Sequence, residues 1–233
     1  AATLNNLGGI YRSIGQPKQA LNYHNQALPV YRELDDRSGE ATVLTSIGQV
    51  YYDIGQPQQA LKHYNQALSI YREIGDRSGE AVALNNMGLV YARIGKPEVA
   101  LNHYNQALPI RREVSDRFGE AVTLNNIGLV YARIGKPEVA LSYYNQSLPI
   151  RREVSDRSGE AVTLNNIGLA YRDMGQPEVA LNYYNQSLPI RREVGDRSGE
   201  AVTLNSIGTV YNSMGQPEKL LITIIKLCLL HAK

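Results

Sequence analysis

A repeat of 40 residues constrains this chain more than any other feature of its sequence. Residues 81–120 match residues 121–160 at 34 of 40 positions. Copies of the unit start at residues 1, 41, 81, 121, 161 and 201, and the sixth is incomplete and altered from about residue 219. A repeat of this length buries its apolar face by stacking on its neighbours. The sequence therefore predicts a single repeat array over residues 1–233.

Each repeat carries the signals of two helices. The first helix is expected to end at a glycine such as Gly55, which tolerates the left-handed conformation found at helix ends. Two residues later comes a proline such as Pro57, which suits the first position of a helix. An Asp or Ser in the junction Asp-Arg-Ser-Gly-Glu, as at residues 196–200, can cap the next helix. The chain is therefore predicted to be all-α, with about twelve helices.

The first helix of each repeat has two distinct faces. Counted from the start of a repeat, positions 4, 7, 8, 10, 11 and 14 share one arc of the helix. In the third repeat they are apolar or small, which predicts packing on neighbouring helices: Leu84, Met87, Gly88, Val90, Tyr91 and Ile94. Positions 2, 5, 9, 12 and 13 lie on the opposite arc, which is not a core face.

The spacing of these apolar residues resembles the tetratricopeptide repeat. Leu124-x2-Ile127-Gly128-x2-Tyr131 followed by Ala140-x3-Tyr144 is similar to W-x2-L-G-x2-Y and A-x3-F, with Leu for Trp and Tyr for Phe. The resemblance implies a right-handed superhelical solenoid of antiparallel helix pairs. The period is 40 rather than 34 residues, and the extra residues predict a longer second helix.

Related families share this longer period or its motifs. The 40-residue period and junctions such as residues 192–200 resemble G-protein-signalling modulators, and residues 164–168 (Leu-Asn-Asn-Ile-Gly) resemble kinesin light chain. The overall sequence pattern resembles that of the tandem repeat arrays of filamentous cyanobacteria. Such arrays are often fused to caspase-like peptidase domains.

In this family the first helices line a concave groove, so the resemblance implies a scaffold that holds a protein or peptide. The predicted groove residues are Asn85, Asn125, Asn165 and Asn205 at position 5, Leu89, Leu129 and Leu169 at position 9, and Arg93, Arg133, Asp53 and Asp173 at position 13. They would suit an apolar segment with an acidic centre and basic flanks, its backbone paired with the amides. Alternatively, the asparagines at positions 5 and 6 join neighbouring helices.

Composition and motifs favour binding over chemistry. The net charge is +2 and evenly spread, there is one cysteine, and no nucleophile, base and orienting group recur together. His24, His63 and His103 occupy second-helix places that other repeats fill with Tyr or Ile, which predicts packing. The Arg-Arg-Glu runs, as at residues 151–153, are expected to form a solvated face with ion pairs. We expect no enzyme, cofactor, metal, nucleic acid or membrane partner, and a cytoplasmic location.

The last repeat departs from the pattern. Residues 223–229 are Thr-Ile-Ile-Lys-Leu-Cys-Leu, where the repeat predicts Tyr-Tyr-Asn-Gln-Ala-Leu-Pro. When a set of codons for the expected peptide is translated from one base later, it encodes the observed residues. A lost base near codon 219 would explain this. Self-association is expected through the exposed apolar residues Leu220, Leu221, Ile224, Ile225, Leu227 and Leu229. Two alternatives to a scaffold stay open, a sensor fragment of a larger protein and a self-associating structural array.

Overall fold

The chain folds into pairs of antiparallel helices. A computed structural model describes residues 1–231, of which Lys226, Leu227 and residues 229–231 are described by their backbone alone. Within that part the predicted twelve helices are confirmed, and no strand occurs. The helices are α1 (Ala2–Ser13), α2 (Pro17–Glu33), α3 (Arg37–Asp53), α4 (Pro57–Glu73), α5 (Arg77–Arg93), α6 (Pro97–Glu113), α7 (Arg117–Arg133), α8 (Pro137–Glu153), α9 (Arg157–Asp173), α10 (Pro177–Glu193), α11 (Arg197–Ser213) and α12 (Pro217–His231).

The helix ends follow the predicted signals. Asp156 accepts a hydrogen bond from the backbone N–H of Gly159 at 2.9 Å and so caps α9. Gly135 follows α7 with a φ of 72°, the left-handed conformation, and Pro137 opens α8. Helices α9 and α10 each have 17 residues. The junction Asp caps the helix that follows it, so this first helix of the next repeat begins within the junction. The extra residues of the 40-residue period therefore do not lengthen the second helix alone.

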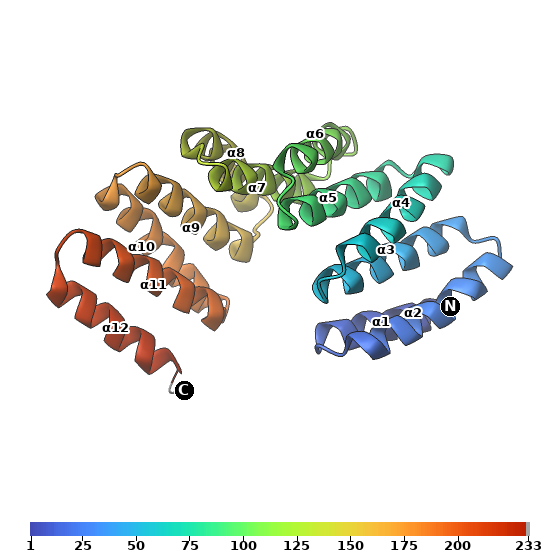
Figure 1. The fold of residues 1–233 in the computed structure, drawn as a ribbon, viewed down its shortest axis with the longest axis horizontal. Coiled ribbons are helices and arrows are strands. Elements are labelled where there is room, and N and C mark those ends of the chain that lie inside the picture. The colour runs from blue at the N-terminus through green and yellow to red at the C-terminus, as the bar shows by residue number, and fades with distance from the viewer. Residues whose placement is uncertain (232–233) are drawn as a thin grey trace. The chain divides into compact units, whose positions relative to one another are not determined.

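Two compact units make up the chain, Ala1–Asp116 with α1 to α6 and Arg117–Lys233 with α7 to α12. In both units each odd-numbered helix pairs with the even-numbered helix that follows it (Figure 1). The even-numbered helix then packs on the next odd-numbered helix. Consecutive odd-numbered helices also contact one another directly: α1 contacts α3 and α3 contacts α5 within the first unit, and α7 contacts α9 and α9 contacts α11 within the second.

An aromatic ring on a glycine holds each of the middle pairs together. The glycine is at position 8 of the odd-numbered helix, and the ring is the tyrosine at position 24 on the even-numbered helix. Tyr144 is 1% exposed, and a Cβ added at Gly128 would lie 2.5 Å from its Cε1 atom. The same contact joins Gly48 with Tyr64, Gly88 with Tyr104 and Gly168 with Tyr184. The first pair has the ring of His24 on Gly8, so the prediction that this histidine fills a packing position is confirmed.

A second ring contact lies beside the first in the same pairs. Tyr131 at position 11 stacks on Tyr143 at position 23, with ring centroids 5.5 Å apart. Histidines take the position-23 place in two pairs, where Tyr51 stacks on His63 at 5.3 Å and Tyr91 on His103 at 5.2 Å. These two histidines therefore also serve packing, as predicted.

The Arg-Arg-Glu runs are not uniformly solvated, and that prediction is wrong for the first arginine of each run. Arg111, Arg151 and Arg191 are 6–8% exposed. They stand at position 31, where the first two repeats have Tyr31 and Tyr71. Each makes an ion pair with the junction aspartate, as Arg151 does with Asp156. The long apolar stem of arginine and its flat guanidinium fill the space that the tyrosine ring takes in the earlier repeats.

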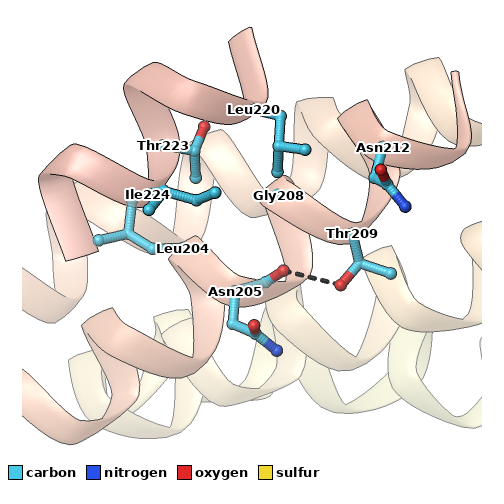
Figure 2. A pocket seen from close by; sticks show the side chains of 8 residues that line it. All are labelled: Leu204, Asn205, Gly208, Thr209, Asn212, Leu220, Thr223 and Ile224. Atoms are coloured by element: carbon cyan, nitrogen blue, oxygen red, sulfur yellow. Dashed lines mark hydrogen bonds between the residues drawn. The ribbon is translucent and has the colours of Figure 1, made fainter. Parts of the chain in front are cut away.

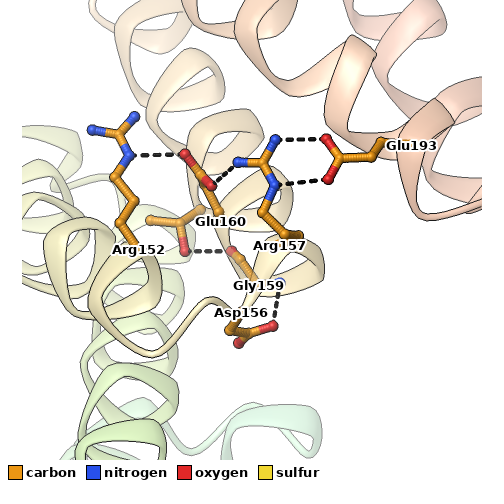
Figure 3. Close-up of polar contacts among 7 residues, drawn as sticks. Arg152, Asp156, Arg157, Gly159, Glu160 and Glu193 are labelled. Atoms are coloured by element: carbon orange, nitrogen blue, oxygen red, sulfur yellow. Dashed lines mark hydrogen bonds and ion pairs between the residues drawn. The ribbon is translucent and has the colours of Figure 1, made fainter.

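The glutamate of each run does form an ion pair, as predicted, and so do the second arginines Arg152 and Arg192. In Figure 3 the buried Glu160 lies between Arg152 and Arg157. The Arg152 Nε donates to Glu160 at 2.8 Å, and Arg157 reaches on to Glu193 in the next helix at 2.7 Å. Hydrogen bonding from Arg157 lowers the pKa of Glu193. The chain of charges spans three helices, α8, α9 and α10, and so ties two neighbouring pairs together.

We expect His24 to make the stability of the chain depend on pH. Burial of the ring and the charge of Arg12 lower the pKa of His24 from its ordinary 6.5 to about 4. The unfolded state therefore binds more protons between these values, so stability falls as pH drops from 6.5 toward 4. In urea unfolding at pH 7 and 4.5, the wild type should lose about 1–2 kcal/mol more than His24→Tyr, which restores the residue of other repeats. An equal loss in the two proteins would contradict this assignment.

Candidate functional site

The odd-numbered helices present a continuous exposed stripe within each unit. Because these helices contact one another directly, their outward positions form one surface across three helices. Along the stripe, position 9 is half-buried at Leu89, Leu129 and Leu169, and position 13 is exposed at Asp53, Arg93, Arg133 and Asp173. Half-buried leucines beside exposed charges of both signs make a surface that can bury apolar groups and pair with charged ones.

In the first unit the charged side chains of the stripe are engaged by other groups of the protein. The Arg12 Nε donates to an Asp53 carboxylate oxygen at 2.6 Å, and the Arg12 Nη1 donates to the Gln49 side chain at 3.1 Å. The Arg93 Nη1 donates to the backbone carbonyl of Tyr52 at 2.7 Å, and its guanidinium lies 5.0 Å from the centre of the Tyr52 ring. These contacts hold Arg93 and Asp53 in place at the ends of α5 and α3.

In the second unit one arginine stands apart. Arg133 is exposed at the end of α7 and makes no ion pair within the described part of the chain. Asp173 is paired instead with its chain neighbour Arg172, at 2.7 Å. Arg133 is therefore a cationic group on the stripe with its donors available to a ligand.

The asparagines at position 5 do not all face outward, and the prediction is corrected for three of them. Asn85, Asn125 and Asn165 are only 5–6% exposed, whereas Asn205 is exposed. The Asn125 side-chain oxygen accepts a hydrogen bond from the Asn166 amide at 3.0 Å. Position 5 lies at the edge of the stripe, against position 6 of the next odd-numbered helix, so the alternative role of joining neighbouring helices describes Asn125.

The predicted self-association residues lie on α12. Leu221, Ile224 and Ile225 are 45–59% exposed, as is Ile222 beside them, and Leu220 is half-buried. The side chains of Leu227 and Leu229 lie outside the described residues. Within the part that is described, no helix has the length and apolar character that crossing a bilayer requires. The same residues include no cluster of three or more histidine, cysteine or acidic groups suited to a metal.

Comparison with solved structures shows where this architecture occurs. RapI in its apo form has 20% sequence identity and a TM-score of 0.83, with 97% of this chain and 82% of that chain covered. BtubC (BKLC) from P. vanneervenii has 19% identity and a TM-score of 0.82, with 93% and 91% covered. A Rap protein complexed with competence and sporulation factor has 15% identity and a TM-score of 0.75, with 98% and 74% covered. These identities establish a shared fold.

Family comparison agrees with the architecture. No curated protein matches the chain. The pattern of the tetratricopeptide repeat matches residues 1–73, 39–113, 79–153 and 159–219, which together cover most of the sequence. Helix pairs of this kind form repeat scaffolds, which agrees with the helix pairing seen within each unit. The chain therefore belongs to the tetratricopeptide repeat family.

Proposed function

We propose that this protein holds an extended segment of another protein against the stripe of its odd-numbered helices. The observation that carries the proposal is the pattern on that stripe, with half-buried leucines at position 9 beside exposed charges at position 13. When a partner's apolar side chains cover these leucines, apolar surface is removed from water, and this favours binding. The exposed charges select which segments fit, because each charge left unpaired on binding is costly.

Arg133 is the residue that we assign to an acidic group of the segment. Its guanidinium presents several donors in one plane, which match the two oxygens of a carboxylate. Arg93 carries the same group, but the carbonyl and ring of Tyr52 already engage it. We therefore expect Arg133 to contribute more to binding than Arg93. Asp173, at the same position of the neighbouring odd-numbered helix α9, favours a basic group elsewhere in the segment.

The structural likeness supports a role in binding without identifying the partner. One similar structure is a Rap protein complexed with competence and sporulation factor, so the shared fold is able to hold a ligand. The same surface would serve a sensor role if this chain were part of a larger signalling or peptidase protein. In both cases the stripe of the odd-numbered helices is the surface that recognises the partner.

A synthetic peptide tests the assignment of Arg133. A fluorescent ten-residue peptide with leucines, one central glutamate and lysines near both ends should bind the wild-type chain in low salt. Arg133→Ala should weaken binding about tenfold, since a charge-assisted hydrogen bond contributes roughly 1.5 kcal/mol. Arg93→Ala should weaken it less. Fluorescence anisotropy at two salt concentrations measures both effects.

Matched variants separate the stripe from general charge. Lys62→Ala removes one positive charge from an exposed position on the even-numbered helix α4 and should leave binding unchanged. Replacing the peptide's glutamate by glutamine should remove the difference between the wild type and Arg133→Ala. Equal binding by the wild type, Arg133→Ala and Leu129→Ser would contradict the proposal.

A second candidate function is self-association through α12. Leu221, Ile222, Ile224 and Ile225 expose 45–59% of their surface on one short segment. Apolar residues gathered in this way usually mark a contact surface. A second copy of the chain that covered them would bury the patch and join two molecules.

Light scattering across a range of concentrations measures this association directly. We expect the average mass of the wild type to rise with concentration and that of a Leu221→Lys, Ile225→Lys variant to stay at the monomer value. Val99→Lys, at a residue that is 38% exposed on α6, serves as a control that adds charge elsewhere and should behave as the wild type. A wild type that stays monomeric at high concentration would rule out this candidate.

A further inference from the structure

The last helix pair lacks both ring contacts that hold the other pairs together. Position 24 is Ile224 instead of an aromatic residue, and position 23 is Thr223. Gly208, the glycine of this pair, is retained, but the nearest side-chain atoms to a Cβ built on it are 3.5 Å away on Leu220 and 3.7 Å away on Thr223. At Gly128 and Gly168 the same construction meets a tyrosine ring at 2.5–2.6 Å. The glycine therefore remains without the ring that it accommodates elsewhere.

A cavity lies where the ring is absent. It has a volume of about 280 Å³ and lies between α11 and α12. Figure 2 shows Leu220, Thr223 and Ile224 on one side of it and Leu204 and Gly208 on the other. A cavity of about 150 Å³ with an apolar lining is large enough to bind benzene. The space between α11 and α12 can therefore receive a phenol ring.

The mouth of the cavity lies on the stripe of the odd-numbered helices. Asn205, Thr209 and Asn212 border it and are exposed, at positions 5, 9 and 12 of the last repeat (Figure 2). The Thr209 hydroxyl donates to the backbone carbonyl of Asn205 at 2.9 Å, which leaves both side-chain amides at the mouth for other partners. A ligand on the stripe would therefore meet an apolar cavity with a polar rim, the usual form of a small-molecule or side-chain site.

We propose that this cavity binds the side chain of a tyrosine in the segment that the chain holds. The occupant follows from the repeats themselves. Each of the four preceding pairs also has a glycine at position 8. There the glycine backbone accommodates a tyrosine ring that is at most 2% exposed. The last pair keeps the glycine and leaves the space open toward the stripe. This assignment rests on the proposed function, since it places the tyrosine in the partner that lies on the stripe.

Two small probes test the cavity without the partner. p-Cresol has the ring of tyrosine, and N-acetyl-tyrosinamide adds the backbone that a peptide would bring. We expect both to bind the wild-type chain, p-cresol with a dissociation constant on the order of 1 mM, because so few atoms make contact. In NMR titrations the Gly208 and Thr209 amide signals should shift. Binding of p-cresol without N-acetyl-tyrosinamide would overturn the assignment to a tyrosine side chain.

Filling the cavity from within should abolish binding. Ile224→Tyr restores the repeat's own ring, so p-cresol should bind at least about tenfold more weakly and the thermal midpoint without ligand should rise. Gly208→Leu blocks the same space by another route. Val179→Tyr adds the same ring at a residue of α10 that is 38% exposed and does not line the cavity, and should leave p-cresol binding unchanged.

The outcomes separate this inference from the proposed function. The cavity assignment would be overturned if p-cresol did not bind the wild type, or if it bound the wild type, Ile224→Tyr and Gly208→Leu equally. Neither result depends on Arg133 or on the ten-residue peptide. Conversely, the proposed function would be overturned if Arg133→Ala bound the ten-residue peptide as tightly as the wild type does. The p-cresol measurements would be unaffected by that result.

Discussion

The contact of an aromatic ring with a glycine supports the architecture of the first five helix pairs. The glycine at position 8 has no side chain, so the ring at position 24 of the next helix can lie directly on the helix backbone. Protein interiors are packed too tightly to allow an extra carbon atom in this contact. The ring therefore sets both the distance and the register of the two helices, and the second stacked ring beside it, as in Tyr131 and Tyr143, reinforces the register.

This arrangement separates what holds the protein together from what it presents to a partner. The rings approach each odd-numbered helix from one side, and the chains of ion pairs such as Arg152, Glu160, Arg157 and Glu193 join neighbouring pairs at their junctions. Positions 9 and 13 of the odd-numbered helices take part in neither contact. They can differ between repeats, as Gln49, Leu89 and Thr209 do at position 9, while the helix pairs stay the same. A repeat protein can diversify its ligand surface in this way without losing its fold.

Much of the fold could be predicted from the sequence because local signals govern helix ends. The junction Asp that caps α9 and the glycine after α7 act within a few residues of the chain. The burial of Arg151 was missed because arginine is usually exposed. The signal was nonetheless present, since position 31 is Tyr31 and Tyr71 in the first two repeats and a substituted residue must fill the same space. Comparison of equivalent positions between repeats would have found it.

The candidate surface was harder to predict, because its limits depend on neighbouring helices. Asn125 belongs to the outward arc of α7 by helical geometry, yet it is buried because α9 packs beside it and Asn166 bonds to it. The cavity beside Gly208 also depends on a pair of residues, a retained glycine and a replaced tyrosine 16 positions later in the repeat. Neither residue alone indicates a cavity. Only the combination of the two does, and the pattern of apolar residues along the helices does not reveal it.

The central claim is that a ring on a glycine holds each of the first five helix pairs together, and two substitutions test it most directly. Urea unfolding should show that Gly128→Ala lowers the free energy of unfolding by about 1–3 kcal/mol, because the added Cβ would meet the ring of Tyr144. Gly208→Ala, at the same position of the last repeat, should be neutral or stabilise by up to about 1 kcal/mol, because no ring opposes it and alanine favours the helix. Equal effects of the two substitutions would contradict the account.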